Sequence, residues 1–172
     1  VYDCEVMGTC LTVTSDPSNL TVNEYITFTT QPTNQTDCPL GTVAFSVDFT
    51  GDHTTIEWLK DGGALPADVD YQNGTSKTLT ITNLDATDAA DYTCRIIGPC
   101  ETRTSNAATL TINETTVINN DPSDALDKCE GTTVNFSTDA SGTNLTYKWY
   151  KGGGILLAGE ENTTLSLTNI TT

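Results

Sequence analysis

The sequence predicts an all-β fold of antiparallel β-sandwiches arranged end to end. Three observations support this prediction: apolar and polar residues alternate in short runs, turn-forming pairs separate the runs, and cysteine and tryptophan recur about 90 residues apart. Alternation means that one face of a strand is buried and the other is wet. Short strands at regular spacing are typical of sandwiches, and we find no convincing helical pattern.

The alternating runs define the strands in order. The clearest spans residues 43–49, where Val43, Phe45, Val47 and Phe49 share one parity. Threonine fills the outward positions of residues 78–82, which suits a β-branched side chain on a pleated surface. The other alternating runs are residues 56–58, 92–96 and 108–112, and the turn signals are residues 61–63, 73–74, 98–99 and 141–142.

The repeat divides the chain at unusual places. The repeated pairs are Trp58 and Trp149 (91 residues apart), Cys38 and Cys129 (91), Cys4 and Cys94 (90), and Cys10 and Cys100 (90). The chain therefore starts late in one repeat, contains a whole second repeat and stops within a third. Internal repeats decide how the rest of a sequence is interpreted.

Composition narrows the classes of partner and compartment. The chain has 7 basic and 23 acidic residues and thus a net charge of −16. This charge argues against nucleic acid or an anionic membrane as a binding partner, because both need clustered basic residues. No apolar run is long enough to span a bilayer, so we expect no membrane insertion. No signal peptide or initiator methionine opens the sequence, which reads as a mature or excised segment.

Six cysteines at repeated spacing indicate a disulfide framework, and hence an oxidising, extracellular or cell-surface location. Zinc is the rival interpretation. It is disfavoured because the chain has no C-x2-C pair and a single histidine, His53. We expect no metal and no cofactor.

Two segments together resemble the immunoglobulin-like (Ig-like) sandwich. One is residues 56–62, with Trp58 on strand C; the other is Leu79-Thr80-Ile81 on strand E followed by residues 88–94, in which Tyr92 stands two positions before Cys94 on strand F. Residues 147–152 repeat the first motif around Trp149, and residues 165–167 repeat the start of the second. The resemblance implies that Trp58, Tyr92, Cys94 and Trp149 are core residues.

The cysteines depart from the usual Ig pattern. Position 47, where strand B usually carries its cysteine, is Val47, and Cys38 stands earlier instead. This arrangement is similar to tandem Ig-like repeats of very large secreted or surface proteins of bacteria. That resemblance implies an intradomain disulfide between Cys38 and Cys100. Cys94 is then left over, either as a buried free thiol or bridged to Cys38 or Cys100.

The ends of the chain look complementary. Residues 1–22 match strands F and G, residues 23–112 form a complete domain, and residues 113–172 match strands A to E. A lone hairpin is marginal in water, and half a sandwich has an open edge. We therefore expect copies to combine head to tail, with Cys10 of one copy facing Cys129 of its neighbour. The alternative is that the chain is a window on a longer tandem array.

Other functional motifs are weak. His53 lies in a loop without a nucleophile motif, so we expect no catalytic residues. Residues 119–124 lack the spacing of a calcium loop and fit a turn better. Eight asparagines begin N-x-S/T sequons, and Asn73, Asn34 and Asn162 are the candidate glycosylation sites.

These features predict a structural or adhesive extracellular repeat protein that is not an enzyme and that forms filaments or elongated surface fibres. A second hypothesis is a ligand-binding receptor ectodomain that uses the loops at residues 51–55 and 96–100. A third is an accessory module of a large secreted hydrolase. The identity of any cell-surface or glycan ligand stays open.

Overall fold

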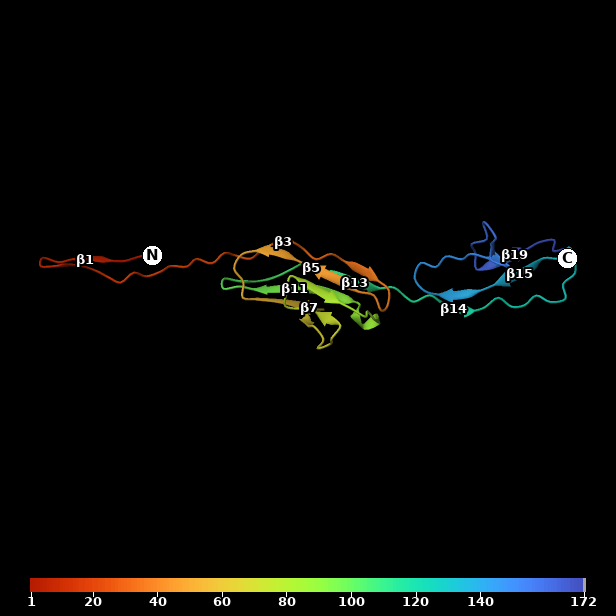
Figure 1. The fold of residues 1–172 in the computed structure, drawn as a ribbon, viewed down its shortest axis with the longest axis horizontal. Coiled ribbons are helices and arrows are strands. Elements are labelled where there is room, and N and C mark those ends of the chain that lie inside the picture. The colour runs from red at the N-terminus through yellow and green to blue at the C-terminus, as the bar shows by residue number, and fades with distance from the viewer. Residues whose placement is uncertain (172) are drawn as a thin grey trace. The chain divides into compact units, whose positions relative to one another are not determined.

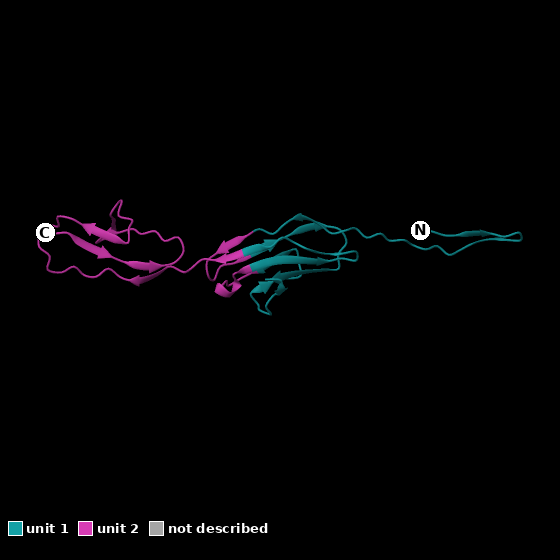
Figure 2. Ribbon diagram, turned by 180° about the vertical axis from the view of Figure 1, so that it is seen from behind, with its two compact units in different colours: residues 1–33, 44–80, 91–109 teal, residues 34–43, 81–90, 110–172 magenta. Residues whose placement is uncertain are grey.

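The computed structural model describes residues 1–171, so Thr172, the last residue of the predicted segment 113–172, lies outside the described part. The described residues are strands, turns and one 3-10 turn, with no α-helix among them (Figure 1). The prediction of an all-β fold is confirmed. Two compact units divide the chain, residues 1–33, 44–80 and 91–109 in one and residues 34–43, 81–90 and 110–172 in the other (Figure 2).

Residues 1–22, which we call the N-terminal hairpin, contain two short strands. They are β1 (Glu5–Met7) and β2 (Thr12–Thr14), which pair antiparallel with Val6 opposite Val13. An isolated bridge joins Tyr2 to Ser18. Every side chain of this hairpin is exposed, so it has secondary structure but no core of its own.

Residues 26–112 form what we call the complete sandwich. Its strands are β3 (Thr27–Thr30), β4 (Gln35–Asp37), β5 (Val43–Ser46), β6 (Asp48–Thr50), β7 (Thr55–Lys60), β8 (Gly63–Ala64), β9 (Tyr71–Gln72), β10 (Thr78–Ile81), β11 (Ala90–Ile97), β12 (Thr102–Thr104) and β13 (Ala108–Ile112). One sheet has the order β4-β13-β11-β7-β8, with β12 also paired to β11, and another has the order β5-β10-β9. A further pair, β3 and β6, is antiparallel.

The core of this sandwich follows directly from the alternation. Inward residues of β5, β7, β10, β11 and β13 are buried, and the neighbours between them are largely threonine, serine or charged residues. Trp58, Tyr92 and Cys94 lie in this core with 2%, 0% and 0% of their surfaces exposed. Burying each large apolar side chain contributes about 1.5–3 kcal/mol to folding.

The turn between β10 and β11 is closed by a reciprocal cap. Asp85 accepts a hydrogen bond from the Thr87 amide, and Asp88 accepts one from the Asp85 amide. These bonds satisfy the Thr87 amide of the 3-10 turn Ala86–Asp88 and the amide of its N-cap residue, Asp85, just before β11 begins. Asp88, the first residue of the Ig-like motif at residues 88–94, therefore has a local physical role in this turn.

Residues 113–171 form what we call the half-sandwich. Its strands are β14 (Val117–Asn120), β15 (Val134–Ser137), β16 (Asp139–Ser141), β17 (Tyr150–Lys151), β18 (Ile155–Leu156) and β19 (Thr164–Leu167). They pair as β14 with β16, β15 with β19 and β17 with β18, as β3 pairs with β6, β5 with β10 and β7 with β8. Within residues 113–171 no strand corresponds to β11 or β13.

Candidate functional site

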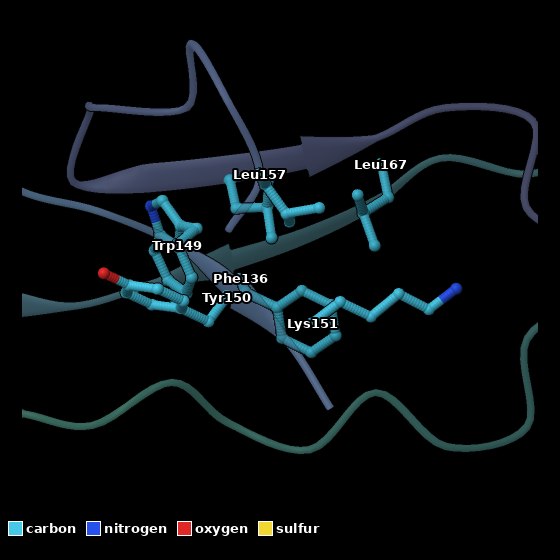
Figure 3. A pocket seen from close by; sticks show the side chains of 7 residues that line it. Phe136, Trp149, Tyr150, Lys151, Leu157 and Leu167 are labelled. Atoms are coloured by element: carbon cyan, nitrogen blue, oxygen red, sulfur yellow. The ribbon is translucent and has the colours of Figure 1, made fainter. Parts of the chain in front are cut away.

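The half-sandwich carries an open apolar groove of about 460 Å³, which we call the acceptor groove. Figure 3 shows the labelled side chains grouped around this groove, with the Tyr150 hydroxyl and the Lys151 amine directed outward on opposite sides. The lining residues come from β15, β17, β19 and the segments beside β17 and β18: Phe136, Trp149, Tyr150, Lys151, Leu157, Leu165 and Leu167. Leu165 is buried, whereas Trp149 is only half-buried, so the groove is the unclosed core of this half-sandwich.

The complete sandwich shows what normally closes such a core. Phe45 stacks on Tyr92 of β11 with ring centroids 5.0 Å apart, and its ring lies 6.3 Å from that of Trp58. In the half-sandwich, Phe136 and Trp149 are the repeat counterparts of Phe45 and Trp58. Because nothing takes the place of Tyr92 in residues 113–171, these two aromatic side chains keep exposed surface.

The two tryptophans are nevertheless anchored in the same way. The Trp58 indole N–H donates to the Ser76 carbonyl at 2.9 Å, and the Trp149 indole N–H donates to the Asn162 carbonyl at 2.9 Å. A buried indole requires such a partner. Trp149, predicted as a core residue, therefore has the same kind of anchor as Trp58 but lines the groove.

The N-terminal hairpin has the hydrogen-bond pattern of the missing strands. In the complete sandwich, the Cys94 amide donates to Ser105 Oγ at 2.9 Å and the Ser105 amide donates to the Cys94 carbonyl at 2.9 Å. In the hairpin, Cys4 and Ser15 make the same two bonds at 3.0 and 2.8 Å. The register agrees as well, since Val6 faces Val13 where Ile96 faces Arg103.

Burial is what distinguishes the two hairpins. Tyr2 is 64% exposed where its counterpart Tyr92 is 0% exposed. Leu20 is 63% exposed where its counterpart Leu110 is 1% exposed. The hairpin thus presents the side chains of a strand F–G core to solvent. Isolated exposed apolar residues are ordinary, whereas this set repeats a pattern that is buried in the complete sandwich.

A charged pair across β11 and β7 can also be compared with its repeat counterparts. Arg95 of β11 lies opposite Glu57 of β7, and its Nε donates to Glu57 Oε1 at 2.7 Å. The hydrogen bond from Arg95 lowers the pKa of Glu57 below its ordinary value, despite partial desolvation. The repeat counterparts of Arg95 and Glu57 are Glu5 and Lys148, so the charges are exchanged between the two strands.

The six cysteines are free thiols in the structure, and Cys94 alone is buried. Cys100 lies in the turn after β11, where its Sγ is 3.8 Å from the Asn23 carbonyl oxygen. Cys38 directly follows Asp37, which pairs with Ile112 at the end of β13.

These positions correct the expected bridge between Cys38 and Cys100. β13 runs antiparallel to β11, because Ser105 bonds Cys94 whereas Thr109 bonds Asp91. The end of β13, and with it Cys38, therefore lies beyond the start of β11, whereas Cys100 lies beyond its end. Eight residues of strand separate those ends by more than about 20 Å, and a disulfide requires Cα atoms within about 7 Å.

The predicted bridge between Cys10 of one copy and Cys129 of its neighbour depends on the same two kinds of turn. The turn at Cys129 repeats the turn at Cys38, since Thr132 and Gly41 each donate to the carbonyl of their own turn cysteine. The turn at Cys10 repeats the turn at Cys100, as Gly8 and Gly98 make the same closing bond. These two cysteines would therefore also stand at opposite ends of one sandwich.

Cys94 fits the interpretation of a small core residue. Burial raises the pKa of its thiol from 9.0 to about 12, and the nearby Glu57 charge adds to the shift. A thiol with so high a pKa is almost entirely protonated at neutral pH and is a poor nucleophile. It is also buried against Trp58, its cross-strand neighbour, rather than beside Cys38 or Cys100.

The remaining sequence candidates lie on the surface. Asn34, Asn73 and Asn162 are exposed, and Asn73 occupies the turn before β10 with a φ of 61°. His53 is exposed beside Phe49, its ring 4.9 Å away and edge-on. Within residues 1–171 there is no cluster of metal-binding side chains and no helix long and apolar enough to cross a membrane.

Sequence reasoning identified the N-terminal hairpin and the half-sandwich but not all residues of the groove. Trp149 was predicted from the repeat, whereas Leu157 and Lys151 of the groove were not. The exchanged charges at Glu5 and Lys148 were also missed. An alignment of the repeats at offsets of 90 and 91 residues reveals that exchange, once the opposed pair Arg95 and Glu57 is known.

Known structures with a similar fold include several tandem Ig domains. An I-band fragment of titin, I67–I69, aligns with a TM-score of 0.74 at 16% identity, covering 88% of this chain and 57% of that one. The extracellular domains 3–5 of Drosophila OTK align with a TM-score of 0.61 at 19% identity, covering 98% and 61%. Rst D1–D2 aligns with a TM-score of 0.61 at 20% identity, covering 84% and 85%.

The chain thus spans about three fifths of the titin and OTK fragments, and at these identities the likeness concerns the fold. The family match concerns the complete sandwich itself. The immunoglobulin I-set domain matches residues 26–114, which include Trp58, Tyr92 and Cys94. The protein therefore belongs to the immunoglobulin I-set domain family.

Proposed function

We propose that this chain is a structural and adhesive extracellular Ig-like protein whose copies join head to tail. The N-terminal hairpin of one copy closes the acceptor groove of the next and so completes a sandwich. The single observation that carries the proposal is that the exposed hairpin repeats the register and hydrogen bonds of the strands that the half-sandwich lacks.

Apolar surface supplies the driving force for this assembly. In the register of the complete sandwich, Tyr2 takes the place of Tyr92 beside Phe136, and Cys4 comes to face Trp149 as Cys94 faces Trp58. Val6 and Leu20 would likewise take the buried positions that Ile96 and Leu110 occupy in the complete sandwich. Each large side chain buried contributes about 1.5–3 kcal/mol, which is set against the entropy lost on association.

Charge supports the choice of the chain's own hairpin as the occupant. Placed like Arg95, Glu5 meets Lys148, and an opposed pair of unlike charges is restored. A hairpin with a basic residue at this position, as in β11, would instead place two like charges together, which destabilises a strand pair. The acceptor groove thus discriminates between two hairpins of the same fold by the sign of one residue.

Strand addition also removes an exposed edge. β17 lacks the neighbour that β7 has in β11, and an open edge is an aggregation liability. A hairpin that adds to this edge pairs its main chain, as in donor-strand complementation. The contact is heterologous, so repetition gives a fibre when the rotation does not close.

Several features support an extracellular role. The relatives in fold include the extracellular domains of OTK, and the net charge of −16 favours a soluble, self-repelling surface. An origin in a large bacterial surface protein is a prediction from the sequence resemblance. The alternative supply of the missing strands is a longer tandem array, in which the next segment of the same polypeptide would fill the groove.

Sedimentation of the full chain tests the proposal. We expect concentration-dependent association above the 18.3 kDa monomer, and Tyr2→Ser should weaken it by about 30-fold because about 2 kcal/mol of burial is lost. Tyr25→Ser is the matched control, since Tyr25 is 71% exposed but lies outside the hairpin. A wild-type chain that stays monomeric at millimolar concentration, or equal effects of the two substitutions, contradicts head-to-tail assembly.

A further inference from the structure

Two exposed cysteines mark the two ends of the complete sandwich. At the downstream end, the Asn113 amide donates to the Asp37 carbonyl at 2.9 Å, and Cys38 is the next residue after Asp37. At the upstream end, the Cys100 thiol lies 3.8 Å from the Asn23 carbonyl oxygen. Each cysteine therefore stands beside a segment that connects the sandwich to a neighbouring domain.

The repeat also gives counterparts of these positions where the half-sandwich begins. Glu114 is the counterpart of Asn23, so a hairpin docked in the acceptor groove places Cys10 beside Glu114 as Cys100 lies beside Asn23. Cys38 stands beside the preceding residue, Asn113. Cys38 and the incoming Cys10 would then flank two consecutive residues, whose Cα atoms are about 3.8 Å apart.

The second junction has the same arrangement. Lys128 precedes Cys129 as Asp37 precedes Cys38, and Asn23 is the counterpart of Asn113. In a completed sandwich, Asn23 of the incoming copy therefore lies beside Lys128 and Cys129. Cys100 of that incoming copy lies beside the same Asn23.

Resting on the proposed head-to-tail assembly, we propose that disulfides join consecutive domains across each junction. Cys38 of one copy pairs with Cys10 of the next copy, and Cys129 pairs with Cys100 of that next copy. These pairings explain why cysteines that stand at opposite ends of one sandwich recur in every repeat. Both bridges connect the same two copies, so each step of the fibre is held by two covalent links.

The oxidant required is a small-molecule or protein disulfide of a secretory compartment. One cysteine thiolate attacks that disulfide, forms a mixed disulfide and expels one thiolate of the oxidant. The second cysteine thiolate then attacks the mixed disulfide and releases the other. Two cysteine thiols thus lose two protons and two electrons, and the oxidant is reduced to two thiols.

Peptide mapping of the assembled full chain tests these pairings. The chain is incubated with glutathione disulfide, residual thiols are blocked, and linked peptides are identified by mass spectrometry. We expect one linked peptide that joins Cys38 to Cys10 and another that joins Cys129 to Cys100. Assemblies whose four thiols remain free, or whose linked peptides join Cys38 to Cys100 or Cys10 to Cys129, overturn the proposal.

Denaturing gels without reductant provide a second readout. Wild type should give a ladder in steps of 18.3 kDa that collapses with reductant. Cys38→Ser and Cys100→Ser singly should keep the ladder through the other bridge, and the double variant should lose it while still sedimenting as an assembly. Monomers in sedimentation without reductant would contradict head-to-tail assembly itself, whereas reducible assembly with scrambled peptides contradicts only the pairings.

Discussion

Arg95 donates a hydrogen bond to Glu57 across β11 and β7, and their repeat counterparts, Glu5 in the N-terminal hairpin and Lys148 in the half-sandwich, carry the opposite charges. The pair is partly exposed, with 42% and 30% of the two side chains accessible, so its contribution to stability is small. In the proposed assembly the sign of this pair would select which hairpin enters which sandwich, because a mismatched hairpin opposes like charges.

Charge exchange between copies provides the first prediction. Glu5→Lys and Lys148→Glu should each weaken self-association by about fivefold, which corresponds to about 1 kcal/mol for loss of the pair plus repulsion. Mixing the two variants should restore association, because every contact between unlike variants is again matched. Sedimentation of the separate and mixed variants measures this, and mixtures as weak as the separate chains would contradict the proposed register.

Tryptophan accessibility provides a second prediction. Trp58 is 2% exposed and Trp149 is half-buried, so acrylamide should quench mainly Trp149 in the dilute chain. As concentration rises, the quenchable fraction should fall because the hairpin covers the acceptor groove. Trp149→Phe is the control, since it should leave only the protected signal. A quenchable fraction that is independent of concentration would be incompatible with closure of the groove.

The Cys94 thiol predicts a loss of stability at alkaline pH. Burial raises its folded pKa to about 12 from 9.0, so the fold favours the protonated thiol. Its contribution is complete below pH 9 and is lost as the pH rises from about 9 through about 12. Urea unfolding across this range, followed at Trp58 in a Trp149→Phe background, should show a weaker pH dependence for Cys94→Val. The exposed Cys100→Ser should match wild type, and an identical alkaline loss in Cys94→Val would refute this assignment.

Glu57 predicts the opposite dependence at acid pH. The hydrogen bond from Arg95 lowers the folded pKa of Glu57 below its ordinary 4.5, so the fold favours the carboxylate. The resulting stability is present above pH 4.5 and is lost as the pH falls through the folded pKa. Glu57→Gln should flatten the acid limb of urea-unfolding midpoints below pH 4.5, whereas the exposed Glu24→Gln should flatten it less. Equal effects of the two substitutions would show that the ion pair is not responsible.

Much of the complete sandwich was predictable because its signals are local. The alternation of Val43, Phe45, Val47 and Phe49 requires one buried face, and those four side chains are buried. The motif around Tyr92 combines an inward aromatic residue with a capped turn, both of which depend on near neighbours in sequence. The repeat spacing likewise predicted that Trp149 occupies the position equivalent to Trp58. It did not predict whether a neighbouring strand covers Trp149.

The pairing of the cysteines depends on the tertiary structure. The sequence alone determined that Cys38 and Cys100 occupy fixed, repeated positions beside strands. Only the tertiary structure decided that they stand at opposite ends of one sandwich, because the direction of β13 against β11 sets which ends meet. The alternation of apolar and polar residues indicates which face of a strand is buried. Whether residues distant in sequence lie close together depends instead on strand order and direction, which are properties of the whole fold.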